Sequence, residues 1–144
     1  MRLKMLTAAV LGVTGLLALP SAAYADNGDR TTVTYCRDLN AAGHVKTRYC
    51  SVTWGKNIYD GTYWQIASMQ LLDSMTDGYC AHGTFSNGGS TLDFQECAGK
   101  WYSRTQRYNG STYRFAIGAQ AGLRSGIWQW SDYTTIDAPS GFHN

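Results

Sequence analysis

Four cysteines constrain what this chain can fold into more than any other feature. Cys36 and Cys50 lie symmetrically about one glycine, and Cys80 and Cys97 lie symmetrically about a Gly-Gly pair. A hairpin that turns at such a midpoint puts its two cysteines on opposed strands, where Cα atoms about 4.5 to 5.5 Å apart suit a disulfide. The sequence therefore predicts two disulfide-linked β-hairpins, Cys36–Cys50 and Cys80–Cys97. In the chain-entropy model each bridge would stabilise the fold by about 3 kcal/mol.

The first 25 residues have the features of a secretory signal peptide. Arg2 and Lys4 give a basic start, an apolar run from Met5 to Leu19 follows, and Ala23-Tyr24-Ala25 fits the small-x-small pattern that precedes a cleavage site. The apolar run is shorter than the roughly 20 residues that a membrane span needs. We therefore expect cleavage near Ala25 and a secreted, extracellular product without a membrane span, in which the cysteines can be oxidised.

Removal of this leader makes the chain close to neutral. It takes two of the 12 Lys and Arg residues and none of the 10 Asp and Glu residues. A neutral chain lacks the broad basic surface of a general nucleic-acid or anionic-membrane binder, so we do not expect such partners. The remaining 119 residues, 144 minus 25, suffice for one domain. We assign residues 26–30 to a mobile leader segment, 31–136 to a single disulfide-stabilised β-rich domain and 137–144 to a tail.

Alternation of apolar and polar residues predicts mainly β structure. Thr31–Arg37, Val45–Trp54 and Ile127–Ile136 alternate and are rich in β-branched and aromatic residues. Asn109-Gly110 is typical of a two-residue hairpin turn and predicts that the segment Trp101–Gly118 folds back on itself. The sequence thus indicates a small antiparallel sheet or sandwich of disulfide-linked hairpins, with at most one short helix packed on it.

One segment, residues 62–76, fits two structures. Trp64, Ala67 and Leu71 recur at helical spacing, and Gly78 stands where a helix C-cap would. The same residues would also suit a buried strand. We favour the helix and keep the strand as the alternative, since the choice decides between an α+β and an all-β domain.

Candidate catalytic residues are few. Histidine is the side chain whose unperturbed charge change suits acid and base catalysis near neutral pH. The chain has three: His44 in an expected hairpin loop, His82 close to a cysteine and His143 beside the C-terminus. Their positions indicate exposed or structural roles. The sequence has no Gly-x-Ser-x-Gly elbow, phosphate-binding loop, EF-hand or zinc-ligand spacing, so we expect no metal and no cofactor.

Glu96 is the only glutamate, and several arginines and a histidine follow it. The order Glu96, then Arg104 or Arg114, then His143 resembles that of the microbial guanyl-specific ribonucleases, although no continuous motif is shared. The resemblance implies general acid and base catalysis by a small secreted hydrolase.

Aromatic residues exceed what a core of this size readily encloses. The part after the leader holds five Trp and nine of the ten Tyr. Such side chains are enriched at binding interfaces because they combine area with a polar tip. We therefore predict an exposed aromatic binding surface, for which the candidates are Trp54, Tyr59, Tyr63, Trp64, Trp128 and Trp130.

These features favour a secreted, non-catalytic binding module. We expect an adaptor or subunit that recognises another secreted or cell-surface protein, through its aromatic surface or by pairing of a free edge strand such as Thr31–Tyr35. A lectin-like module that stacks glycans on exposed Trp is the first alternative, and the ribonuclease-type hydrolase is the second. The sequence leaves the identity of the partner and the oligomeric state open.

Overall fold

The computed structural model describes residues 24–36, 39–126 and 128–143, so nearly all of the predicted signal peptide lies outside the described residues. This part consists of eight β-strands and one short 3-10 helix. In chain order they are β1 (Arg30–Thr34), η2 (Ala41–Gly43), β2 (Val45–Lys56), β3 (Tyr63–Asp73), β4 (Cys80–Ser86), β5 (Thr91–Glu96), β6 (Tyr102–Asn109), β7 (Arg114–Gly122) and β8 (Trp128–Asp137).

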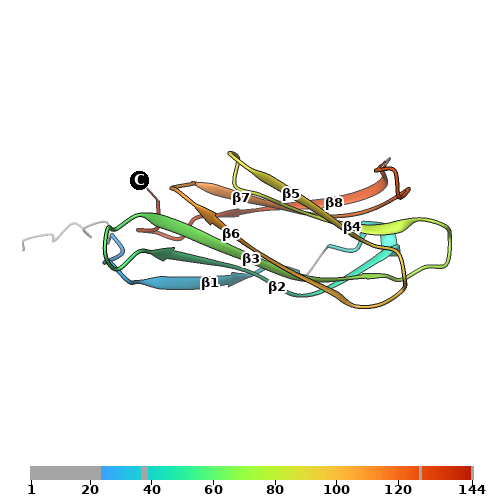
Figure 1. The fold of residues 1–144 in the computed structure, drawn as a ribbon, viewed down its shortest axis with the longest axis horizontal. Helices are drawn as coiled ribbons and strands as arrows, with labels where there is room; N and C mark the ends of the chain where they lie inside the picture. Colours follow the sequence, from blue (N-terminus) through green and yellow to red (C-terminus); the bar gives the residue numbers. More distant parts are fainter. Residues whose placement is uncertain (1–23, 37–38, 127, 144) are drawn as a thin grey trace, which may run out of the picture.

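The strands form two antiparallel four-stranded sheets that enclose one core. Sheet A has the strand order β1-β2-β3-β6, and sheet B has the order β5-β4-β7-β8. Figure 1 shows the sheets as two layers, with β5, β7 and β8 above β1 and β2. The predicted fold class, a mainly β domain built as a small antiparallel sandwich, is confirmed.

Residues 62–76 contain strand β3, so the helix that we favoured there is wrong. In β3 every second residue from Tyr63 to Leu71 is buried, which is the period of a strand. The helical spacing in the sequence arises because outward residues such as Trp64 and Ile66 are also large and apolar. This composition suits β3, which lies inside sheet A between β2 and β6.

The predicted hairpin over residues 101–118 does not form. β6 pairs with β3, whereas β7 pairs with β4 and β8, so the chain crosses from sheet A to sheet B after the Asn-Gly turn. The turn is bonded to β3, since Gly110 N–H donates to Tyr63 O at 2.7 Å. Core packing accounts for the crossing: Tyr108 and Phe115 point into the space between the sheets and meet edge to face, with 5.2 Å between ring centroids.

The second disulfide-linked hairpin has the predicted geometry. Strands β4 and β5 pair from Ser86 opposite Thr91 to Ala81 opposite Glu96. The next pair in this register is the Cys80–Cys97 disulfide, whose Cα atoms are 4.5 Å apart. The glycine-centred symmetry therefore predicted both the pairing and the register.

The first disulfide is also confirmed, but its strands are offset by one residue. Cys36 and Cys50 are bonded, with Cα atoms 5.1 Å apart, yet Thr34 opposes Ser51. The register of β2 against β3 shifts nearby, and Tyr49 adopts a left-handed conformation with φ of 53°. A local bulge at Tyr49 therefore absorbs the offset that simple symmetry did not predict.

The core draws large side chains from both sheets, and the two ends of the described chain meet at its edge. Ala25 N–H donates to Gly141 O at 3.2 Å, and Phe142 packs in the core cluster. The largest fully buried apolar side chains are Trp54, Phe85, Phe115, Met69, Leu71 and Ile117.

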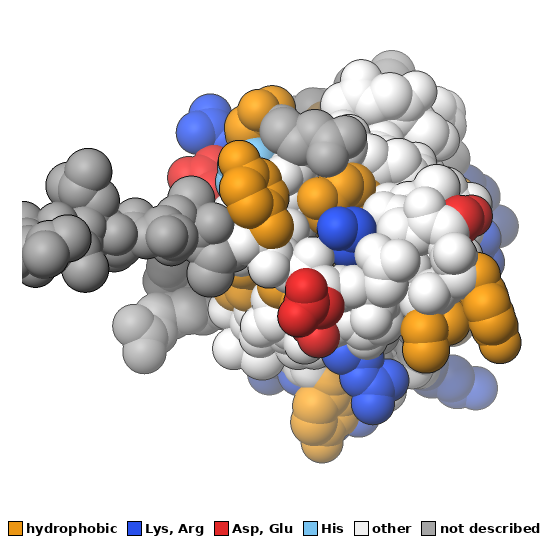
Figure 2. Space-filling view, turned by 90° about the vertical axis from the view of Figure 1, so that its left-hand side faces the viewer, with side chains coloured by type: hydrophobic (Ala, Val, Ile, Leu, Met, Phe, Trp, Pro, Cys, Tyr) orange, Lys and Arg blue, Asp and Glu red, His pale blue; other side chains and the backbone are white. Residues whose placement is uncertain are grey.

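One end of the sandwich carries the β2–β3 and β6–β7 connections. Figure 2 looks onto the corresponding end of Figure 1 and shows hydrophobic side chains in separate groups, with polar and charged side chains between them. Hydrophobic side chains are therefore distributed rather than gathered on this face. Within the described residues no helix is long and apolar enough to cross a membrane.

Candidate functional site

The outer face of sheet B carries polar side chains on all four strands. Antiparallel pairing aligns them in rows across the sheet, because opposed residues share a face. One row contains Asp93, Thr84, Gly118 and Tyr133, and the next contains Gln95, His82, Gln120 and Ser131. Together with Trp128, which lies at the end of this face, we call these residues the sheet B site.

Tyr133 lies flat on the sheet in the first row. A Cβ atom at Gly118 would stand 2.5 Å from Tyr133 Cε1, so the ring occupies the space above this glycine. Tyr133 is 59% exposed. Partial burial raises the pKa of Tyr133, and the negative charge of Asp93 adds to the effect. The residue therefore offers an open aromatic surface and a phenol that stays protonated.

Gln120, Thr84 and Asp93 form a hydrogen-bonded chain across three strands. Gln120 Nε2 donates to Thr84 Oγ1 at 3.0 Å, and the Thr84 hydroxyl donates to Asp93 Oδ1 at 2.7 Å. Gln120 is 2% exposed, and its Oε1 has no hydrogen-bond partner in the described part of the chain. Leaving such an acceptor unsatisfied costs about 1 to 3 kcal/mol. A hydroxyl group that reached it would recover part of this cost.

His82 lies beneath Trp128. Their rings meet edge to face with 4.2 Å between centroids, and His82 is buried whereas Trp128 is 39% exposed. Burial lowers the pKa of His82, an effect that the backbone of Gly122 and Leu123 and the charge of Asp93 partly offset. Because the ordinary value is about 6.5, His82 is neutral at pH 7. Its Nε2 has no hydrogen-bond partner among the described residues.

A shallow hollow of about 380 Å³ opens at the Trp128 end of the site. Its volume falls within the range of about 300 to 1,000 Å³ that is typical of small-ligand sites. The hollow is lined by the Asp93 carboxylate, the Gln95 amide and the Arg124 guanidinium. The rings of His82 and Trp128 also line it. This combination can bond hydroxyl groups and pack against apolar faces of a ligand.

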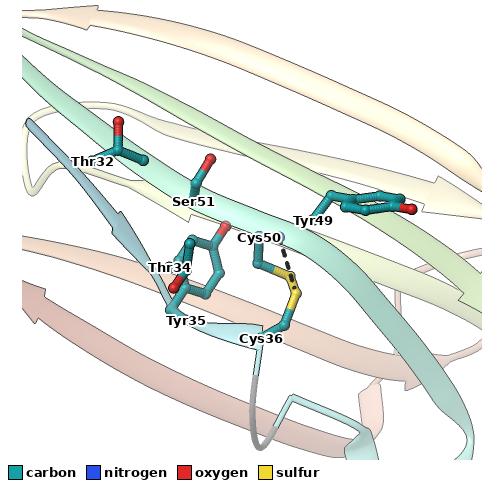
Figure 3. A pocket seen from close by; sticks show the side chains of 7 residues that line it. All are labelled: Thr32, Thr34, Tyr35, Cys36, Tyr49, Cys50 and Ser51. Carbon is teal, nitrogen blue, oxygen red and sulfur yellow. Dashed lines mark hydrogen bonds between the residues drawn. A yellow bond between two sulfur atoms is a disulfide. The ribbon is translucent and has the colours of Figure 1, made fainter.

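A second hollow lies on sheet A, where β1 meets β2 beside the first disulfide (Figure 3). Tyr35 is fixed there, because its hydroxyl donates to Ser68 O at 3.1 Å, and burial raises its pKa. Tyr49 is 73% exposed at the bulge. The other lining residues are Thr32, Thr34, Cys36, Cys50 and Ser51, and Figure 3 shows the Thr32 and Ser51 hydroxyls pointing the same way from neighbouring strands.

The aromatic residues that we predicted as a binding surface do not share one face. Trp54 and Tyr63 are buried in the core, with exposures of 0% and 8%, so the expectation that they are exposed is wrong. Tyr59 is 93% exposed in the β2–β3 connection. Both buried residues alternate inward on their strands. The number of aromatic residues predicted an exposed surface, but a number does not show on which face of a strand each residue lies.

The remaining three predicted residues fall on different surfaces. Trp64 lies on the outer face of sheet A, where Arg107 stands over its ring. Trp128 belongs to the sheet B site. Trp130 faces inward and stacks on His44, with 3.7 Å between ring centroids.

His44 is held in place rather than free in a loop. Its Nδ1 lies 2.6 Å from Asp77 Oδ2, and its ring stacks on Trp130. The Tyr79 N–H, and then His44, lower the pKa of Asp77. This cluster joins the β1–β2 and β3–β4 connections to β8, so its evident role is structural.

The residues of the ribonuclease-like order do not assemble. Glu96 is buried at one end of β5, where it accepts two backbone N–H groups. Arg114 lies at the far end of sheet B and pairs with Asp137 at 2.7 Å. His143 packs on a tyrosine near Arg114 rather than near Glu96. Among the ion pairs of the described residues, none joins Arg104 to Glu96.

Sequence reasoning missed the most connected residues of the sheet B site, namely Asp93, Gln120 and Tyr133. A signal for them exists in β7, where the outward residues Gly118 and Gly122 are small and leave room for rings from β8. These small residues can be interpreted only when the strands that pair with β7 are known.

These features define an antiparallel β-sandwich domain with two disulfides, whose two outer faces carry different sets of side chains. No known protein family, curated protein or solved structure matches the chain. Within residues 24–36, 39–126 and 128–143, no group of three or more His, Cys, Asp or Glu side chains is placed to hold a metal ion.

Proposed function

We propose that the protein is an extracellular, non-catalytic module that binds a neutral glycan through the sheet B site. The observation that carries the proposal is Tyr133, flat and 59% exposed beside the Gln120–Thr84–Asp93 hydrogen-bonded chain. The predicted signal peptide and the two disulfides support an extracellular location. The sequence suggested a lectin-like module as an alternative. The site that we propose for it shares only Trp128 with the aromatic residues that the sequence suggested.

The chemistry of the site suits a sugar chain. Sugar hydroxyls both donate and accept hydrogen bonds, and sugar C–H faces pack on aromatic rings, so a site with rings beside amide and carboxylate groups matches both. Trp128 and Tyr133 lie opposite Gly122 and Gly118, which are four positions apart on β7, roughly 13 Å along a strand. The distance favours an oligosaccharide that spans the site over a single sugar.

Affinity electrophoresis of the protein without its leader tests the proposal. The gels would contain soluble neutral polysaccharides: xylan, mixed-linkage β-glucan, galactomannan and dextran. We expect at least one polymer to retard the protein and the Trp128→Ala and Tyr133→Ala variants to migrate freely. Tyr59→Ala, which removes an exposed aromatic at the other end of the sandwich, is the matched control and should be retarded as strongly as the unaltered protein.

Retardation by none of the polymers would contradict the glycan proposal. So would equal loss in all three variants, because that result would indicate a general aromatic effect. Circular dichroism of each variant separates lost binding from lost folding.

A protein partner is the second candidate, and the free edge of β1 favours it. Tyr35 N–H donates to Cys50 O, and Lys56 N–H donates to Asp29 O, so odd-numbered residues of this segment bond β2. The backbone groups of Thr32 and Thr34 therefore point to the open edge, where no strand of the described chain pairs with them. An extended segment of another protein could add there as a fifth strand.

The Thr34→Pro variant tests the second candidate, because proline removes one edge N–H while the bonds to β2 remain. We expect cross-linking to a partner in culture fluid to be lost in Thr34→Pro and kept in Thr34→Val, which retains the N–H. Equal cross-linking by both variants would count against edge pairing.

A further inference from the structure

The described strands of sheet A carry positive and no negative charges on their outer face. Strand pairing places Arg30, Lys46, Arg48 and Arg107 on this face. The outward residues of β1, β2, β3 and β6, all within the described part, include no Asp or Glu. Since the chain without its leader is close to neutral, this face concentrates cationic charge.

Arg48 is held by a ring and an amide. Its guanidinium lies over the Trp101 ring, 3.8 Å from the centroid, and its Nε donates to Gln70 Oε1 at 2.6 Å. Gln70 Nε2 in turn donates to Ser103 Oγ at 2.8 Å. The side chain is therefore fixed while its Nη groups stay available.

Arg107 repeats this arrangement on the other edge of the face. Its guanidinium stands 4.9 Å from the centroid of the Trp64 ring, and its Nε donates to Asn109 Oδ1 at 3.2 Å. A guanidinium has five N–H donors, so each arginine keeps four on its two Nη atoms. The ion pairs of the described residues do not include Arg48 or Arg107.

Hydroxyl groups lie between and beside the two arginines on this face, around the apolar side chain of Ile66. They bond to each other across strands, which keeps them aligned without filling their bonding capacity. The pairs are Thr32 with Thr53 at 2.8 Å and Ser68 with Thr105 at 3.1 Å. The result is a flat polar surface with preorganised anion donors at its margins.

We propose that this face binds an acidic polysaccharide, a sugar chain that carries carboxylate or sulfate groups. Arg48 and Arg107 bind two acidic groups through their Nη donors, and the Ser and Thr hydroxyls bond the sugars between them. The two arginines stand on β2 and β6, four residue steps and two strands apart, which corresponds to roughly 16 Å between Cα atoms. The ligand must therefore be an extended chain.

The same geometry disfavours a nucleic acid and an acidic protein. Single-stranded nucleic acids need rings with a free face on which bases stack. The Trp64 ring has Arg107 on one side and lies where a Cβ of Gly55 would be on the other, so bases cannot stack on it. Tyr49 beside Arg48 is exposed, but it lies at the opposite end of the arginine pair and does not make a row of rings with Trp64. Protein interfaces centre on buried apolar anchors, whereas the centre of this face offers one aliphatic side chain, Ile66, in a row with Thr53 and Arg107 and beside the bonded hydroxyls.

Retention on a heparin column in a salt gradient, followed by titration with heparin oligosaccharide, tests the inference. We expect the protein without its leader to bind at low salt and to elute as NaCl rises. The Arg48→Gln/Arg107→Gln variant should bind at least about tenfold more weakly, because each substitution removes charge-assisted hydrogen bonds. The matched control is Arg114→Gln/Arg124→Gln, which removes two positive charges on the sheet B side of the sandwich and should retain most of the heparin affinity.

Three results would overturn the inference: no binding of the unaltered protein, an equal loss in the control variant, or tighter binding of single-stranded DNA than of heparin through the same arginines. Tyr133→Ala should leave heparin binding unchanged. Failure of the glycan site on sheet B and failure of this site are therefore separate results.

Discussion

The two outer faces of the sandwich share a construction and differ in what they leave unbonded. Each has an aromatic ring laid over a glycine of the neighbouring strand, Trp64 over Gly55 on sheet A and Tyr133 over Gly118 on sheet B. Sheet A leaves donors open, on the Nη atoms of its arginines. In the described part of the chain, sheet B leaves two acceptors unbonded just below its surface, on a buried amide oxygen and a neutral imidazole.

This difference indicates that ring placement alone does not define a binding site. Glycine beneath an aromatic ring is a structural arrangement that fills a gap in a sheet, and it occurs on both faces. Selectivity would come from the hydrogen-bonding groups around the ring. Open donors suit acidic ligands, and open acceptors suit the hydroxyl groups of neutral sugars.

The largest expected effect comes from the Cys80–Cys97 disulfide, which holds β4 to β5 at one end of the sheet B site. Replacing both cysteines with serine should lower the free energy of unfolding by about 3 kcal/mol, since the bridge closes a short loop. Neutral-glycan binding should weaken more than heparin binding. Urea unfolding and both binding assays measure this, and equal weakening of the two activities would break the distinction between the faces.

Substitution of the two glycines should affect the faces one at a time. Gly118→Ala puts a methyl group into the Tyr133 ring, and Gly55→Ala puts one into the Trp64 ring. Each should destabilise the fold by about 1 to 3 kcal/mol, because the ring must move. We expect Gly118→Ala to lose glycan retardation and Gly55→Ala to lose heparin affinity. The opposite pattern would reverse the assignment of ligands to faces.

Removal of one hydroxyl should sharpen the role of the hydrogen-bonded chain on sheet B. Thr84→Val breaks its bonds to Gln120 and Asp93, at a cost of about 1 kcal/mol per lost hydrogen bond. Thr105→Val removes a hydroxyl from the sheet A face and is the control. Affinity electrophoresis should show weaker glycan binding for Thr84→Val only. Unchanged binding by Thr84→Val would show that the Gln120–Thr84–Asp93 hydrogen bonds do not contribute to glycan binding.

The smallest expected effect is a dependence of stability on pH through His82. Burial lowers the pKa of His82 in the folded state, so the unfolded chain takes up the proton first as pH falls. Stability is therefore lost as pH drops below about 6.5, the ordinary value, and the loss levels off below the folded-state pKa. Urea unfolding between pH 8 and pH 5 should show this component in the unaltered protein and not in His82→Gln.

Heparin binding through Lys and Arg side chains should change far less over the same pH range. An equal pH response in His82→Gln and the unaltered protein would show that His82 does not contribute to this dependence.

The sequence predicted the parts of the fold that depend on neighbours along the chain. The Cys80–Cys97 hairpin follows from a glycine turn and symmetric spacing, which are local features. The 101–118 segment has the same local signal in its Asn-Gly turn, yet Tyr108 and Phe115 reach into the core from different sheets. Turn chemistry is local, whereas the choice of strand partner depends on packing across the whole sandwich.

The candidate sites were harder to predict, for a related reason. A strand with large residues on both faces, such as β3, gives no sign of which face is the core, so Tyr63 was expected at the surface. Trp54 lies on β2, whose outward residues are polar, and a count of aromatic residues alone placed it at the surface. The sheet B site takes its residues from β4, β5, β7 and β8, and Asp93 meets Gln120 only through pairing of three strands. The composition predicted that some aromatic side chains would be exposed. Which residues surround them depends on the strand pairing, which the sequence did not show.

One measurement tests the central claim, that the two outer faces bind different ligands. Affinity electrophoresis in a neutral polysaccharide that retards the protein would compare Trp128→Ala/Tyr133→Ala with Arg48→Gln/Arg107→Gln. The account predicts that the aromatic variant runs freely and the arginine variant is retarded like the unaltered protein. Loss of retardation in both variants, or in the arginine variant alone, would contradict it.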